Sequence, residues 1–173
     1  MTKQAWRLSL ILLLTVSVGL ILSLMIVSAD FGTNWTGQFY NCVDLSCGVV
    51  ETETYANGLN FDWDANPEDD DGNLLTNVNA DDFTARFTST QTFSAGTYEF
   101  QVTANDGVRL YIDGVLTEIN DFEDNALTTY VLSIELSAGD HSLSVEFLNN
   151  DGDAILQVQW FLDNSATSTP AAT

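Results

Sequence analysis

The chain of 173 residues is strongly acidic, with 25 Asp and Glu residues against four Lys and Arg and a formal net charge of −21. Two of the four cations, Lys3 and Arg7, precede the first acidic residue, so residues 30–173 carry a formal charge of −23. Nucleic acid and anionic membrane surfaces are therefore poor partners, because both are polyanions. The acidity fits either a solubilising surface or, where carboxylates converge in space, a site for a hard cation such as calcium.

Residues 1–29 have the composition of an export signal. Lys3 and Arg7 form a basic start, Leu8–Val27 is an apolar run, and Val27-Ser28-Ala29 has the small residues of a cleavage site. We favour a cleaved signal peptide, although the apolar run of 20 residues is also long enough to cross a bilayer as a signal anchor. Both interpretations place Asp30 onward outside the cytoplasm, secreted or at the cell surface. The membrane becomes a partner only if the segment is retained.

Residues 30–163 are long enough to form one domain with a buried core. Cys42 and Cys47 are the only cysteines, and such a close pair in an exported chain indicates a small-loop disulfide rather than a thiolate metal site. Its stabilisation should fall at the low end of about 2–4 kcal/mol, because the closed loop is short. Residues 164–173 are rich in Ser, Thr, Ala and Pro and are predicted to be disordered.

A long stretch rich in Asp and Asn, Asp62–Asp82, is predicted to be a solvated loop. It does not fit the EF-hand calcium template, because Pro67 would take the first ligand position and Val78 the last. A looser cation site in this loop is the less favoured alternative.

The rest of the chain shows period-two alternation and no useful helical periodicity. Asp113-Gly114 is a hairpin turn, and further turn sequences lie at Ser137–Asp140 and Asn149–Asp153. The sequence therefore predicts an all-β fold, an antiparallel sandwich or barrel, after an N-terminal apolar signal or anchor helix. The strands expected from alternation cover residues 83–87, 97–102, 108–112, 115–119, 130–136, 141–148 and 154–162.

Seven segments in order resemble the pattern of PA14 domains, over nearly all of Trp35–Phe161. The most specific is Ala104-Asn-Asp-Gly-Val-Arg-Leu-Tyr-Ile-Asp-Gly114. The resemblance implies a β-sandwich or barrel, and in several members of the family carbohydrate binding. The other six segments are Trp35-Thr-Gly-Gln-Phe-Tyr40, Asn60-Phe-Asp-Trp63, Ala80-Asp-Asp-Phe-Thr-Ala-Arg-Phe87, Ser94-Ala-Gly-Thr-Tyr-Glu-Phe100, Leu136-Ser-Ala-Gly-Asp-His-Ser-Leu-Ser-Val-Glu-Phe147 and Ala154-Ile-Leu-Gln-Val-Gln-Trp160.

The adhesin branch of this family holds calcium with two adjacent aspartates, joined by a cis peptide, and with an asparagine and carbonyls on a second loop. The resemblance places the first pair at Asn105-Asp106 and the second-loop asparagine at Asn149, followed by Asp151 and Asp153. The first four of these five residues, up to Asp151, are the implied metal ligands, and all five are the implied carbohydrate-binding residues. Asn105 departs from the family pattern, although an amide oxygen is a legitimate calcium ligand. The alternative is that Asn105-Asp106-Gly107 is only a tight turn.

Other residues suggest structure rather than chemistry. His141 is the only histidine and is expected to pack or to hydrogen-bond, with no catalytic triad or zinc site around it. Arg86 and Arg109 are expected to pair with carboxylates, and the resemblance makes Trp35, Trp63 and Trp160 core residues. We therefore expect a non-enzymatic, extracellular carbohydrate-binding module, with a glycan as partner and calcium as its cofactor. The alternatives are a structural or adhesive surface domain without sugar binding and, least favoured, a glycoside hydrolase.

Overall fold

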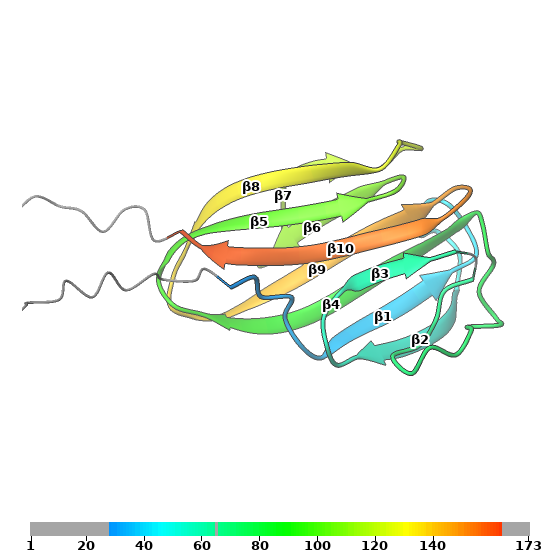
Figure 1. The fold of residues 1–173 in the computed structure, drawn as a ribbon, viewed down its shortest axis with the longest axis horizontal. Coiled ribbons are helices and arrows are strands. Elements are labelled where there is room, and N and C mark those ends of the chain that lie inside the picture. The colour runs from blue at the N-terminus through cyan, green and yellow to red at the C-terminus, as the bar shows by residue number, and fades with distance from the viewer. Residues whose placement is uncertain (1–27, 65, 164–173) are drawn as a thin grey trace, which may run out of the picture.

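The computed structural model describes residues 28–64 and 66–163, which form two antiparallel sheets packed face to face (Figure 1). The larger sheet has the strand order β2-β1-β4-β9-β6-β7, and the smaller one has the order β3-β10-β5-β8. The ten strands are β1 (Trp35–Tyr40), β2 (Val49–Tyr55), β3 (Asn60–Trp63), β4 (Phe83–Phe93), β5 (Gly96–Ala104), β6 (Val108–Ile112), β7 (Val115–Asp121), β8 (Thr128–Leu136), β9 (Gly139–Asn149) and β10 (Ala154–Leu162).

The all-β prediction is confirmed, and of the two predicted architectures the sandwich is the one observed. The predicted signal or anchor segment, apart from Ser28 and Ala29, and the predicted tail lie outside the described residues. Across residues 28–64 and 66–163, no helix is long and apolar enough to cross a membrane.

The core lies between the two sheets and is built by alternate residues of each strand. Along β5, for example, Tyr98, Phe100 and Val102 are buried, while the residues between them are half-buried. Trp35, Trp63 and Trp160 are at most 6% exposed, as expected for core residues. Each large side chain buried in this way contributes about 1.5–3 kcal/mol, which makes this core the main source of stability.

Three strands lie outside those expected from alternation. The strand β1 was indicated only by the family resemblance, as the segment Trp35–Tyr40. The edge strand β2 was not predicted, because its residues alternate between Glu and Thr instead of between polar and apolar side chains, and most of it is exposed. The strand β3 occupies Asp62 and Trp63 at the start of the predicted acidic loop. The remaining loop satisfies itself: Asp69 Oδ1 accepts hydrogen bonds from the backbone N–H groups of Asp71 and Asn73 at 2.9 and 2.8 Å. The prediction of a solvated loop is only partly right, because Leu75 and Val78 of this loop are buried in the core.

The predicted disulfide between Cys42 and Cys47 is present and closes the loop after β1. The described chain enters and leaves at the same end of the sandwich, where Asp30 and Trp160 pair through two backbone hydrogen bonds. The β5–β6, β7–β8 and β9–β10 connections lie at the opposite end (Figure 1). The topology therefore gathers these three loops, together with the β1–β2 and β3–β4 connections, at the end away from the chain ends.

Candidate functional site at the loop end of the sandwich

Asp106 ties the β5–β6 loop to the β9–β10 loop. Its side chain is buried, and Oδ2 accepts hydrogen bonds from the backbone N–H groups of Asn150, at 2.6 Å, and Asp151, at 3.4 Å. Its own N–H donates to the carbonyl of Asn125 in the β7–β8 loop, at 2.9 Å. Burial raises the pKa of Asp106, and the nearby carboxylate of Asp124 acts in the same direction, while the two backbone hydrogen bonds lower it. Asp106 thus connects all three loops.

The turn at Asp106-Gly107 is sterically specified. Asp106 has φ +66°, a left-handed conformation that Asp tolerates better than most residues, and no cis peptide bond occurs among the described residues, so the Asn105–Asp106 peptide is trans. A Cβ on Gly107 would lie 2.8 Å from backbone atoms of Phe122 and Glu123. Glycine is required there because the β7–β8 loop packs directly on the chain. The cis peptide implied by the adhesin branch is not found.

Asn105 binds the far side of the β9–β10 loop. Its Nδ2 donates to the carbonyl of Asp153 at 2.8 Å, and its backbone N–H donates to the carbonyl of Ile155 at 3.0 Å. The side-chain amide of Asn105 uses only its nitrogen in this bond, and its oxygen can still accept a hydrogen bond or bind a cation.

Asn149, the last residue of β9, is fully buried. Its Nδ2 donates to the carbonyl of Ala80 at 3.1 Å, whereas Oδ1 has no hydrogen-bond partner. It is the one buried side-chain polar atom of the described residues in that condition. Leaving a buried acceptor unsatisfied costs about 1–3 kcal/mol, so folded proteins rarely keep one without a reason.

Hydrogen bonds join Asn105 to Asp153 and Asp106 to Asp151 at this end of the sandwich, whereas the side chain of Asn149 bonds to Ala80. The five predicted residues also differ in character. Asp106 and Asn149 are buried and Asn105 is half-buried, while Asp151 and Asp153 are exposed at the rim and join the network through their backbone atoms. Within the described ranges, no three Asp, Glu, His or Cys side chains converge as a metal cluster. A cation held here would need amide and carbonyl oxygens in addition to carboxylate. Calcium accepts such a ligand set.

Sequence reasoning missed the residues that complete this end of the sandwich. Asn125 and Ala80 contribute backbone carbonyls, and Asn150 bridges the loops, with its Nδ2 donating to Asp124 Oδ2 at 3.1 Å. The sequence feature that could have indicated the β7–β8 loop as part of the site is the Asp- and Asn-rich composition of residues 120–125. Backbone carbonyls leave no such trace in sequence.

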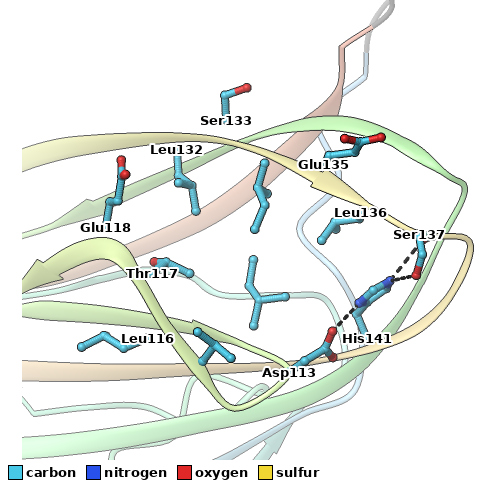
Figure 2. Close-up of a pocket in the computed structure, with 13 residues that line it drawn as sticks. Asp113, Leu116, Thr117, Glu118, Leu132, Ser133, Glu135, Leu136, Ser137 and His141 are labelled. Atoms are coloured by element: carbon cyan, nitrogen blue, oxygen red, sulfur yellow. Dashed lines mark hydrogen bonds and ion pairs between the residues drawn. The ribbon is translucent and has the colours of Figure 1, made fainter.

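A second group, Asp113, His141 and Ser137, superficially has the order of a catalytic triad (Figure 2). His141 Nδ1 lies 2.6 Å from Asp113 Oδ2, and Nε2 lies 3.2 Å from Ser137 Oγ. However, Nε2 also lies 3.1 Å from the carbonyl oxygen of Ser137, which only accepts, so this nitrogen donates. The Asp113 carboxylate and the Ser137 carbonyl raise the pKa of His141. While His141 is protonated it donates through both nitrogens and has no lone pair with which to activate serine. The hydrogen-bonding role expected for His141 is confirmed.

Arg86 and Arg109 pair with a carboxylate, as predicted, and both use Glu146 on β9. The distances are 2.8 Å from Arg86 Nη2 to Glu146 Oε1 and 3.3 Å from Arg109 Nη1 to Glu146 Oε2. Arg109 also lies over the ring of Phe122, with 4.1 Å between Cζ and the ring centroid. Both arginines of the described residues are therefore engaged within the domain.

These features define a β-sandwich domain with a polar site built on the loops at one end. The chain belongs to the PA14 family, because the model of the PA14 domain matches residues 37–173.

A curated relative is the anti-sigma-I factor RsgI3 of Acetivibrio thermocellus, which is 26% identical over 132 residues. The match covers 75% of this chain, and the chain spans 19% of the relative's length. Among solved structures, an anti-sigma factor domain-containing protein from Clostridium clariflavum is similar with a TM-score of 0.65 and 23% identity, covering 77% of this chain and 43% of that one. A PA14 sugar-binding domain from an RTX adhesin has a TM-score of 0.55 and 22% identity, with 74% and 89% covered.

Proposed function

We propose that this protein is an extracellular carbohydrate-binding module whose site, on the loops around Asp106 and Asn149, uses calcium. Support comes from the structural relatives named for sugars. One is the sugar-binding domain of an RTX adhesin, and another is an epithelial adhesin domain from Candida glabrata in complex with β-lactose, with a TM-score of 0.52 and 14% identity. The disulfide agrees with a location outside the cytoplasm. The name of the curated relative carries less weight, because the chain spans only 19% of it.

The observation that carries the calcium proposal is the buried, unpartnered Oδ1 of Asn149. The Asp106–Gly107 turn alone explains why Asp106 is buried, since its carboxylate caps the β9–β10 loop. It does not explain Asn149, whose amide oxygen faces the full cost of burial without a partner. A cation at this end would take Asn149 Oδ1, with the Asp106 carboxylate and the Asn105 amide oxygen as further ligands. Bound calcium would supply open positions for sugar hydroxyls.

The alternative of a structural or adhesive domain without sugar binding would leave Asn149 as a tolerated defect. Calorimetric titration of calcium into the purified protein separates the two. We expect one tight site in the wild type and at least about tenfold weaker binding in Asp106→Asn, which removes the negative charge of one ligand, and in Asn149→Leu, which removes a ligand outright. Asp71→Asn, an exposed carboxylate of the acidic loop, is the matched control and should leave the site unchanged.

A glycan array with calcium and with chelator then tests the sugar step. Calcium-dependent signals that disappear in Asn149→Leu support the proposal. If all four proteins titrate alike, binding weakly at many carboxylates or not at all, the calcium site is refuted and the structural alternative is favoured. Turnover of a panel of aryl glycosides would point to the hydrolase alternative instead.

A further inference from the structure

The outer edge of β8 is an unpaired strand edge. Among the described residues β8 pairs with β5 alone, in an unbroken register that includes Tyr98↔Ile134. Near the two ends of β5, the Thr97 carbonyl accepts a hydrogen bond from the Asp163 N–H, and the Asn105 N–H donates to the Ile155 carbonyl. The backbone N–H and C=O groups of the odd-numbered residues of β5 therefore point toward β10. Backbone groups alternate along an antiparallel strand, so even-numbered residues of β5 and β8 bond to each other. The N–H and C=O groups of the odd-numbered residues in β8 therefore point to the open edge; these are Thr129, Val131, Ser133 and Glu135.

The other edges of the sandwich are blunted and β8 is not. The edge strand β7 is bulged against β6, and Thr117 Oγ1 fills the bulge by donating to the Leu110 carbonyl and accepting from the Ile119 N–H. The strand β2 also carries a register shift, and β3 has only four residues. By contrast, β8 has nine residues, neither Gly nor Pro, one charged side chain, and an outward Val131 that is 59% exposed. Edges of this kind are sites of strand addition.

A groove of about 750 Å³ runs beside this edge, between β8 and the β6–β7 hairpin (Figure 2). Leu132 and Leu136 of β8 line one side. Val115 and Leu116 line the other, and they are 68% and 40% exposed. A strand added to β8 would place every second side chain in this groove, because strand side chains alternate between faces. The edge and the groove thus form one surface, which we name the β8 groove.

The charge around the β8 groove selects its occupant. Glu118 and Glu135 line it, and Asp113 at its closed end is already paired with His141. The net charge of −21 makes a second copy of this chain a poor occupant. We propose that the β8 groove binds an extended segment of a partner protein, in which apolar residues alternate with Lys or Arg, as an added strand. Backbone hydrogen bonds would supply affinity, and the carboxylates would select the cationic segment.

The probe is a blocked synthetic peptide as long as β8 that alternates Val with Lys. Controls replace every Lys by Glu, or keep the composition and break the alternation. NMR titration of the purified protein should show slowed amide exchange at Val131, Ser133 and Glu135. Val131→Pro removes one open-edge N–H that the β5–β8 ladder does not use, so affinity should fall at least about tenfold. Val131→Thr keeps that N–H and should bind as the wild type does.

Glu135→Lys should weaken the Lys peptide and strengthen the Glu peptide. Retained exchange protection at Leu132 and Ile134 verifies that Val131→Pro is folded, and Ser133→Pro replaces it if it is not. Equal binding by wild type and the proline variant overturns the proposal, as does equal binding of the non-alternating peptide. The absence of any peptide binding also overturns it. A dimer that protects the odd-numbered amides without peptide would show that the occupant is a second copy.

Discussion

Replacement of Asn149 by Leu separates the structural and ligand-binding roles of this residue. The variant loses the hydrogen bond from Nδ2 to the Ala80 carbonyl, a cost of about 1 kcal/mol, while water can reach the half-buried Ala80. It also removes the unpartnered Oδ1, which relieves about 1–3 kcal/mol. In chelator, the free energy of unfolding should therefore stay unchanged or rise by up to about 2 kcal/mol, whereas most substitutions of buried residues lower it.

With calcium present, the two proteins should behave differently. Calcium at a hundred times its dissociation constant would stabilise the wild type by about 2.7 kcal/mol. In a domain of this size that raises Tm by on the order of 10 °C, and the variant should show no such shift. Thermal unfolding followed by fluorescence, with chelator and with calcium, measures both quantities. A loss above about 3 kcal/mol in chelator would refute the inference that Oδ1 lacks a partner, and a retained calcium shift would show that Asn149 is not a ligand.

Three further predictions concern the scaffold. Gly107→Ala should destabilise the domain by about 1–3 kcal/mol in denaturant unfolding, because its Cβ would overlap the backbone of the β7–β8 loop; an unchanged midpoint would contradict this. Glu146→Gln should cost about 2–3 kcal/mol, because Glu146 is buried and binds two arginines; screening of the partly exposed Arg86 limits the loss, and a change below 0.5 kcal/mol would refute it. His141 has a raised pKa and Asp113 a lowered one, so their pair stabilises fully between about pH 4 and 6.5 and is lost as pH rises through the folded pKa of His141 or falls through that of Asp113. Asp113→Asn should accordingly lower Tm at pH 5.5 and have little effect at pH 9, and an equal loss at both values would contradict the pairing.

The strands could be predicted from the sequence where one face of the strand is buried in the core and the other is exposed to solvent. Tyr98, Phe100 and Val102 alternate with polar residues because a strand turns successive side chains to opposite faces. The same rule fails for β2, since an exposed edge strand needs no apolar face, and its alternating Glu and Thr are all polar although their burial alternates. The disulfide between Cys42 and Cys47 could be predicted because its formation depends mainly on the short spacing of the two cysteines and on an oxidising compartment.

By itself, the sequence determined the acidic character, the all-β class, the disulfide and the positions of the site-forming loops, because composition, periodicity and turn chemistry are local properties. Only the tertiary structure decided which polar groups are satisfied. Asn105 and Asn149 look alike in sequence, yet the first is half-buried at the loop end and the second is fully buried with an unpartnered oxygen. Likewise, β8 is an open edge only because no other described strand pairs with its outer side. Burial and hydrogen-bond satisfaction depend on neighbours brought from distant parts of the chain.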